Sequence, residues 1–455
     1  IIQQEDVGQR QVTTPAPTNT SSINVAYVIS ITSCQPNSTH VIDGAAILGH
    51  SIDLSSQQSK NYKEYARYAF VYAPAASTCI PILETLGWKT IVKDKLPVEQ
   101  DQIQDFKLRQ AVAVRGCCGV AEFMKLFAYT LVEHPIVVHL DTDVVILKTM
   151  EELFDTMLGQ RMTLPPYHWM QNISLPPTQG ADFYFTRDYH QASKATNDTS
   201  QYGVQGGFFV VKPNLTMYKE LTERLVQKET YTIRKGWSGQ GHTGYWGASQ
   251  IQGYLSYVYK HHYPGRAVEL NRVRIVKIAN CDYQLWFPSG RCRHSHEIFL
   301  SPSCQCIYNS MINDPPRHET TGACLTGQEI CEDCRLTDIN TIYTIHMTLC
   351  RKPFECPFLR KPTHPVLCQD AHRAWFLVRK HLEQEVWSQS VPTGGWNFHW
   401  TLGYCRSYRT RKYLPLDIPN LHVGANDSDR LKSLSDTDRL KSWSDSPKKY
   451  YAKLP

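Results

Sequence analysis

The sequence lacks any long apolar run and any concentration of charge. No stretch of its 455 residues approaches the length of about 18 consecutive apolar residues that a membrane-spanning helix needs. The net charge is only +6 and the basic residues are dispersed, so no basic stripe of the kind that binds nucleic acid is present. The sequence therefore predicts a globular protein without a nucleic-acid partner. Because the chain begins with Ile1 rather than Met, we expect membrane attachment only through an anchor outside this chain.

Cysteine, by contrast, is abundant. The chain has 15 cysteines, and ten of them lie between Cys281 and Cys368. Clustered cysteines and acceptor sequons for N-glycosylation together indicate an oxidising, secretory compartment, with a cytosolic protein rich in buried thiols as the alternative. The odd count leaves at least one thiol outside any disulfide within the chain. The six sequons begin at Asn19, Asn37, Asn172, Asn197, Asn214 and Asn426.

The cysteine cluster allows two interpretations. Its closely spaced pairs and two nearby histidines could form a zinc site, whereas the sequons favour disulfides. The candidate zinc ligands are Cys304, Cys306, Cys331, Cys334, His294 and His296.

Composition divides the chain into five predicted segments. The first is polar and rich in Thr, Pro and Gln, and the last repeats Asp-Arg-Leu-Lys-Ser; such composition is typical of chains that do not pack a core. The segments are a disordered stem (1–22), an α/β core (23–275), a Cys-rich insertion (276–345), a C-terminal part of the core (346–415) and a low-complexity tail (416–455).

The core shows strands alternating with helices, which predicts βαβ units and a mostly parallel sheet. After the first four strands, Gly206 and Gly207 introduce a further bulky apolar strand within 202–213, and Asn214 is a suitable N-cap for a helix over 214–229. The preceding elements are predicted strands at 23–33, 68–72, 89–92 and 135–140, and predicted helices at 43–58, 77–86 and 120–133.

Two carboxylates, Asp141 and Asp143, follow the fourth of these strands. Side chains two residues apart in an extended chain point to the same side, and ligands commonly bind at the carboxyl ends of strands in α/β sheets. Such a pair suits a divalent cation that carries phosphate oxygens. The alternative is a turn whose two acids face water.

An ordered set of motifs resembles the family 8 glycosyltransferases, the group that includes glycogenin, galactinol synthase and plant xylan glucuronosyltransferases. The resemblance covers about residues 23–260 and resumes at about 341–360. Its carriers are the strand Val25 to Thr32 followed by Gly44 to Ser51, Lys125 sixteen residues before Asp141, Asp141-x-Asp143 followed by Glu152-Leu-Phe-Asp155, Gly206-Gly207-Phe208, Gln252-Gly253, and His346-Met-Thr-Leu-Cys-Arg-Lys352-Pro-Phe354.

The resemblance implies a GT-A fold, which is a Rossmann-like α/β domain with a mixed sheet, here carrying the Cys-rich insertion. It also implies transfer of a sugar from a UDP-sugar with retention of configuration, with Mn²⁺, or Mg²⁺, as cofactor. By the same resemblance, Asp141, Asp143 and His346 would hold the metal. Lys352 and Asp141 would lie at the diphosphate of the nucleotide. Ser30, Ile31 and Thr32 would lie at its base and ribose.

The same resemblance assigns the sugar pocket and the catalytic residues. Gln205, Gly206 and Gly207 would line the pocket, and Gln252 and Lys125 would lie close to the donor sugar. The family often has Asn at the position of Gln205, an acid at Ile251 and Gly at Leu349. We expect Asp188 to take the role of the missing acid, with Asp182 as the alternative. The predicted catalytic residues are therefore Gln252, Lys125 and Asp188.

These expectations describe a retaining glycosyltransferase in the Golgi lumen, anchored as a type II membrane protein in its full-length form. Its acceptor would be a glycan, a protein or a small molecule. A cytosolic, glycogenin-like protein that glucosylates itself is one alternative, although none of the 25 tyrosines stands out as its acceptor. A catalytically silent GT-A domain that serves as a scaffold is the other.

Overall fold

The computed structural model describes ten stretches of the chain: 25–34, 39–114, 118–160, 181–187, 203–270, 339–347, 350–356, 366–388, 403–406 and 412–419. Several predictions fall outside them. These are the stem at 1–22, Asp188, nearly all of the insertion at 276–345 with its candidate zinc ligands, and most of the tail at 416–455.

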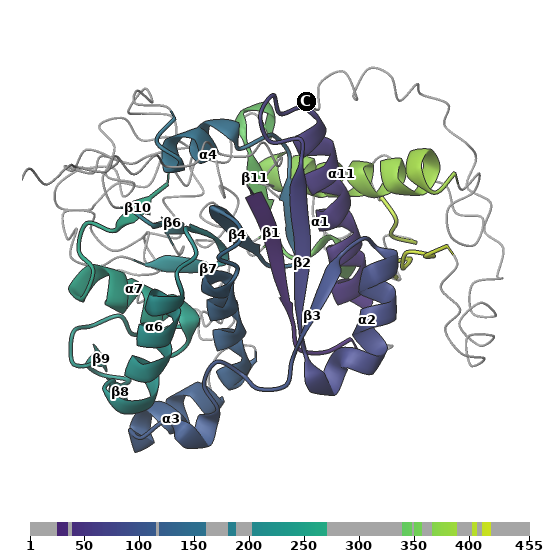
Figure 1. The fold of residues 1–455 in the computed structure, drawn as a ribbon. Coiled ribbons are helices and arrows are strands. Elements are labelled where there is room, and N and C mark those ends of the chain that lie inside the picture. The colour runs from purple at the N-terminus through teal and green to yellow at the C-terminus, as the bar shows by residue number, and fades with distance from the viewer. Residues whose placement is uncertain are drawn as a thin grey trace, which may run out of the picture.

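The main sheet has seven strands in the order β10-β6-β7-β4-β1-β2-β3 (Figure 1). β1, β2, β3 and β4 are parallel to one another, β7 runs antiparallel between β4 and β6, and β10 is parallel to β6. The strands are β1 (Val25–Ile31), β2 (Tyr65–Tyr72), β3 (Lys89–Lys93), β4 (Ile136–Leu140), β6 (Phe183–Arg187), β7 (Val204–Val211) and β10 (Ala267–Glu269).

This mixed α/β arrangement confirms the predicted fold class, and each predicted strand of the core has its counterpart in β1, β2, β3, β4 or β7. Two small antiparallel pairs complete the sheets: β5 (Val144–Ile146) with β11 (Thr344–His346), and β8 (Tyr231–Thr232) with β9 (Gly236–Trp237).

Helices connect and cover the strands. The principal helices are α1 (Thr39–Gln57), α2 (Ala76–Thr85), α3 (Phe106–Val114), α4 (Glu151–Met157), α6 (Leu215–Gln227), α7 (Ile251–His261), α11 (Val366–His381) and the 3-10 helix η3 (Gly119–Thr130). Shorter helical turns are η1 (Ala73–Ala75), η2 (Gln100–Gln102), η6 (Ile339–Thr341), η7 (Pro353–Glu355) and the π-helical η9 (Leu382–Val386).

The sheet has an apolar core on each face because successive side chains of a strand alternate between faces. In β1, Ala26 and Val28 join the cluster beneath α3, η3, α6 and α7, whereas Tyr27 and Ile29 join the cluster beneath α1, α2 and α4. The predicted cap of α6 is present, since the Asn214 side chain accepts a hydrogen bond from the Met217 amide at 3.1 Å.

A third apolar cluster lies where α11 packs alongside α1 (Figure 1). No helix was predicted at α11, although Leu367, Ala371, Trp375 and Val378 recur there at helical spacing and are buried. The helix also buries two polar residues, His372 and Arg379. The third cluster also includes Val145 of β5 and Ile345 of β11. The third cluster therefore holds the β5–β11 pair against α1 and α11.

Three disulfides join the described segments: Cys34–Cys79, Cys350–Cys368 and Cys356–Cys405. Three of the ten clustered cysteines, Cys350, Cys356 and Cys368, are thus in disulfides rather than in a zinc site. Among the helices that the structure describes, none combines the length and the apolar character needed to cross a bilayer.

Candidate metal centre

The Asp141-Thr142-Asp143 segment forms the turn between β4 and β5. The Val144 amide donates to the Asp141 carbonyl at 3.1 Å, which closes the turn. Gly44 of α1 lies against this turn, and a β-carbon at Gly44 would come within 3.1 Å of the Thr142 carbonyl carbon. A larger residue at position 44 would therefore push the helix away from the turn.

Pairing of β5 with β11 brings His346 to the same turn. His346 lies opposite Val144 in the antiparallel register, and the amide of Met347 donates to the Asp143 carbonyl at 3.0 Å. Backbone hydrogen bonds thus place a histidine from about two hundred residues further along the chain beside the two aspartates.

The three side chains converge on one point. One ligand atom from each of Asp141, Asp143 and His346 lies within 4.8 Å of the others. The Nε2 atom of His346 is 3.1 Å from Oδ1 of Asp143 and 3.8 Å from Oδ2 of Asp141. Two carboxylates and one imidazole leave coordination positions for phosphate oxygens, and this oxygen and nitrogen set suits Mn²⁺ better than Ca²⁺.

A lysine holds the other oxygen of each carboxylate. Lys125 of η3 lies 2.9 Å from Oδ1 of Asp141 and 3.1 Å from Glu122, and it donates to the Gly206 carbonyl at 3.2 Å. Lys352 forms an ion pair with Oδ2 of Asp143. The two lysines therefore orient the carboxylates so that their remaining oxygens face His346.

The charges around Asp141 keep its carboxyl group ionised. Burial alone would raise its pKa, but the charge of Lys125, with further contributions from His346 and His139 at the acidic pH where the carboxyl titrates, outweighs burial and lowers the pKa to about 2. Burial, with a further contribution from Lys125, lowers the pKa of the fully buried His139 to about 3. The Asp141 carboxylate is therefore in the state that a metal ligand needs at neutral pH.

Gly207 of β7 permits this close approach. Its carbonyl accepts a hydrogen bond from the Asp141 amide at 2.9 Å. A β-carbon at Gly207 would lie 2.7 Å from Nε2 of His346 and 2.8 Å from Oδ2 of Asp141. These are the two atoms that face the proposed ion, so glycine is required here by space rather than by backbone conformation.

We expect Gly207→Ala to weaken Mn²⁺ binding by about 10- to 100-fold, because displaced ligand geometry costs affinity in that range. The measurement is calorimetric titration of Mn²⁺ into the folded variant. Gly159→Ala is the control, since nothing lies within 4 Å of its added β-carbon. Its φ of 71° disfavours alanine, so this variant carries a backbone cost without touching the metal ligands. Equal Mn²⁺ affinities for the two variants would contradict the assignment.

The predicted sugar-pocket residues adjoin the metal site. The Gly206 amide donates to Oε1 of Gln252 at 3.1 Å, and the amide of Gly207 donates to the Gln205 side chain. Gln252 lies in the first turn of α7, and its Nε2 donates to the Trp246 carbonyl at 2.8 Å. The structure thus places Gln252, Gly206 and Lys125 in one hydrogen-bonded series that ends at Asp141.

The predicted nucleotide-binding residues lie at the carboxyl end of β1. In the parallel register Val28 lies opposite His139, so Ser30 comes level with Asp141 at the same edge of the sheet. The Ser30 hydroxyl is 3.0 Å from Nε2 of His139. Ile31 is buried and Thr32 is partly exposed.

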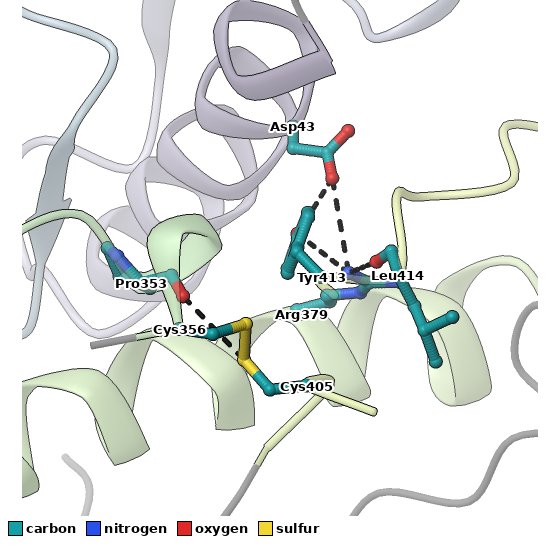
Figure 2. Close-up of a disulfide and its surroundings, with 7 residues drawn as sticks. All are labelled: Asp43, Pro353, Cys356, Arg379, Cys405, Tyr413 and Leu414. Carbon is teal, nitrogen blue, oxygen red and sulfur yellow. Dashed lines mark hydrogen bonds and ion pairs between the residues drawn. A yellow bond between two sulfur atoms is a disulfide. The ribbon is translucent and has the colours of Figure 1, made fainter. Parts of the chain in front are cut away.

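Two disulfides bracket the segment that carries Lys352. Cys350 is bonded to Cys368 of α11, and Cys356 is bonded to Cys405. Figure 2 shows the second of these bonds beside Pro353, whose carbonyl faces the Cys405 sulfur. Lys352 therefore belongs to a short loop that is fixed covalently at both ends.

Asp182 and Asp188 are the two acids expected to take the role of the family's missing acid. Asp182 pairs with Arg266, and its carbonyl accepts from the Lys212 amide at the far end of β7. Asp182 therefore lies at the ends of the strands opposite to those that carry the metal site. The structure does not bring Asp182 to the metal site. Asp188 and Leu349 lie outside the described residues, and Ile251 is buried.

Sequence reasoning missed two residues that support the site. Glu122 lies one helical turn before Lys125 and pairs with it, a spacing that could have signalled the contact. His139 hydrogen-bonds Ser30 and stacks on Phe209 with ring centroids 4.9 Å apart. The sequence showed that His139 lies two residues before Asp141. It did not show that the His139 side chain joins Ser30 of β1 to Phe209 of β7.

No protein-family model matches the sequence, and no curated protein matches it. Solved structures that align with the chain include the galactosyltransferase LgtC in complex with donor and acceptor sugar analogues, at 10% identity over 55% of this chain and 75% of that one, with a TM-score of 0.32. Mouse xyloside xylosyltransferase 1 aligns at 14% identity over 55% and 86%, with a TM-score of 0.32. The bifunctional glycosyltransferase WbbM aligns at 13% identity over 82% and 53%, with a TM-score of 0.39. TM-scores this low support no conclusion about activity.

Proposed function

We propose that this chain is a GT-A glycosyltransferase of the family 8 type, which moves a hexosyl-type sugar from a UDP-sugar to a glycan, protein or small-molecule acceptor. The observation that carries the proposal is the convergence of Asp141, Asp143 and His346 beside Lys352. This arrangement lies at the carboxyl edge of β1 and β4, where α/β sheets commonly bind ligands.

The residues around the metal site have distinct roles in this proposal. A bound Mn²⁺ or Mg²⁺ ion would act as a Lewis acid on the departing diphosphate. Lys352 would add a second positive charge on the same group. Ser30, Ile31 and Thr32 at the carboxyl end of β1 would hold the base and ribose. Gln252 and the Gly206–Gly207 backbone would hold the donor sugar beyond the diphosphate.

The transfer breaks the bond between the anomeric carbon and the diphosphate oxygen and forms a bond from that carbon to the acceptor oxygen. The acceptor proton passes to the departing diphosphate, so UDP is released and no oxidant or reductant is needed. With attack on the same face as departure, the product keeps the anomeric configuration. A double displacement through a carboxylate is the rival route, and trapping a glycosyl-enzyme adduct would favour it.

The proposal is tested by incubating the purified protein with a panel of UDP-sugars and Mn²⁺, Mg²⁺ or a chelator. Water serves as a substitute acceptor, so hydrolysis can be measured before the natural acceptor is known. We expect release of UDP from at least one donor with Mn²⁺ and none with chelator. A properly folded protein that hydrolyses no UDP-sugar and binds no UDP would refute the function and favour the silent scaffold.

The disulfides support a secretory location, since such bonds persist in oxidising compartments. We propose that the enzyme works in the Golgi lumen and that its full-length form is anchored as a type II membrane protein. This location disfavours the cytosolic, self-glucosylating alternative. Occupied N-glycosylation sites on the protein from its native cells would support the location, and their absence from all six sequons would argue against it.

A further inference from the structure

The loop that leads into α7 displays an exposed tryptophan. Trp246 is 60% exposed, whereas Trp88, Trp237 and Trp375 are at most 2% exposed. A large aromatic surface left in water forgoes the stabilisation that burial would give it. Such side chains recur in binding sites because they offer a wide contact area with few rotatable bonds.

The backbone around Trp246 is fixed rather than free. Gly244 and Gly247 adopt left-handed conformations with φ of 85° and 74°. The buried Trp237 donates from its ring nitrogen to the Ala248 carbonyl at 2.7 Å, and Gln250 donates to the Gly119 carbonyl at 2.8 Å. The exposed indole is therefore carried on a preorganised loop, which lowers the entropic cost of binding through it.

A short series of hydrogen bonds connects this loop to the metal site. The Trp246 carbonyl accepts from Nε2 of Gln252 at 2.8 Å, and Oε1 of Gln252 accepts from the Gly206 amide at 3.1 Å. The Gly206 carbonyl in turn accepts from Lys125, the partner of Asp141. The Trp246 backbone thus borders the part of the site that the proposed function assigns to the donor sugar.

The hydrogen bonds of Gln252 tie the Trp246 loop to β7 rather than to β1. β1, β4 and β7 are consecutive neighbours in the sheet. The proposed function puts the nucleotide base at the end of β1, the diphosphate at the end of β4 and the sugar at β7. The Trp246 loop therefore lies at the sugar end of this order, two strands away from β1, where the proposed function puts the base.

We propose that the Trp246 indole is the binding platform for a neutral carbohydrate acceptor, an inference that rests on the proposed function. The C–H bonds on one face of a sugar ring would pack against the electron-rich face of the indole. The hydroxyl groups at the rim of the sugar ring would remain available, and one of them would point back toward Gln252 and the anomeric carbon of the donor.

The test compares the full chain with Trp246→Ala in calorimetric titrations with xylohexaose, cellohexaose and mannohexaose. We expect the wild type to bind at least one of them, and the variant to bind it at least about tenfold more weakly, as for a tryptophan at the centre of an interface. Trp246→Phe should recover most of the affinity. Phe106→Ala is the matched control, because Phe106 is also 60% exposed but lies at the start of α3.

A separate UDP titration with Mn²⁺ distinguishes an acceptor platform from a base platform. Weaker UDP binding by Trp246→Ala, with unchanged oligosaccharide binding, would overturn the proposal. So would a wild-type protein that binds none of the three oligosaccharides. Hydrolysis of UDP-sugars and UDP binding report on the proposed function independently. Oligosaccharide binding that depends on Trp246, with neither hydrolysis nor UDP binding, would refute the transferase and keep the carbohydrate site.

Discussion

Asp143→Ala should lower hydrolysis of the accepted UDP-sugar by about 10³-fold, since single electrostatic groups at a reacting centre contribute roughly 10²- to 10³-fold. The change removes a carboxylate that lies 3.1 Å from His346 and forms an ion pair with Lys352. Both the metal and the lysine that would neutralise the diphosphate lose their orientation at once. Asp143→Asn should keep the packing and lose most of the activity.

The measurement is UDP release at saturating donor over a series of Mn²⁺ concentrations. Asp101→Ala is the control, because Asp101 is exposed on η2. Circular dichroism verifies that the variants fold, and Met347 still donates to the backbone carbonyl of residue 143 after the substitution. Turnover and Mn²⁺ dependence equal to those of the wild type would refute the metal site.

Arg379→Met should lower the free energy of unfolding by about 3–5 kcal/mol, the usual result of removing one partner of a buried ion pair. Arg379 and Glu383 are fully buried, and Asp43 of α1 is 2% exposed. The Arg379 guanidinium lies 3.0 Å from Glu383 and 3.9 Å from Asp43, so the substitution leaves two buried carboxylates without their cation.

The network also holds residues 412–419 in place. Figure 2 shows its members Asp43, Arg379, Tyr413 and Leu414. Arg379 donates to the Tyr413 oxygen, and the Tyr413 hydroxyl donates to Asp43, each at 2.7 Å. Because Asp43 directly precedes Gly44, which packs on the Asp141–Asp143 turn, loss of this network should also weaken the support behind the metal site.

Urea denaturation measures the loss of unfolding free energy in Arg379→Met, with Arg373→Met as its matched control on the same helix. Arg373 pairs with Asp370 at 2.6 Å, but the two side chains are 24% and 28% exposed. A pair so accessible to water contributes about 1 kcal/mol or less. Equal destabilisation by the two substitutions would show that the buried network contributes no more than a surface pair.

Local patterns in the sequence predicted much of the α/β core. The apolar stretch before Asp141 and the one after Tyr202 are strands because β-branched and aromatic side chains pack well on a pleated surface. The alternation of strands and helices then implied a largely parallel sheet. Two strands, β6 and β10, were missed. β10 has three residues, which is too few for a period to be distinguished.

The sequence by itself determined the chemistry of the ligands, because carboxylates at the end of a strand, a histidine and nearby lysines are a matter of residue type and spacing. Tertiary structure decided which of them meet. His346 reaches Asp143 through the pairing of β5 with β11, and Lys125 reaches Asp141 across the start of β7. It also decided that Trp246 stays exposed beside Gln252. Such contacts join residues far apart in the chain, and no local period or propensity encodes them.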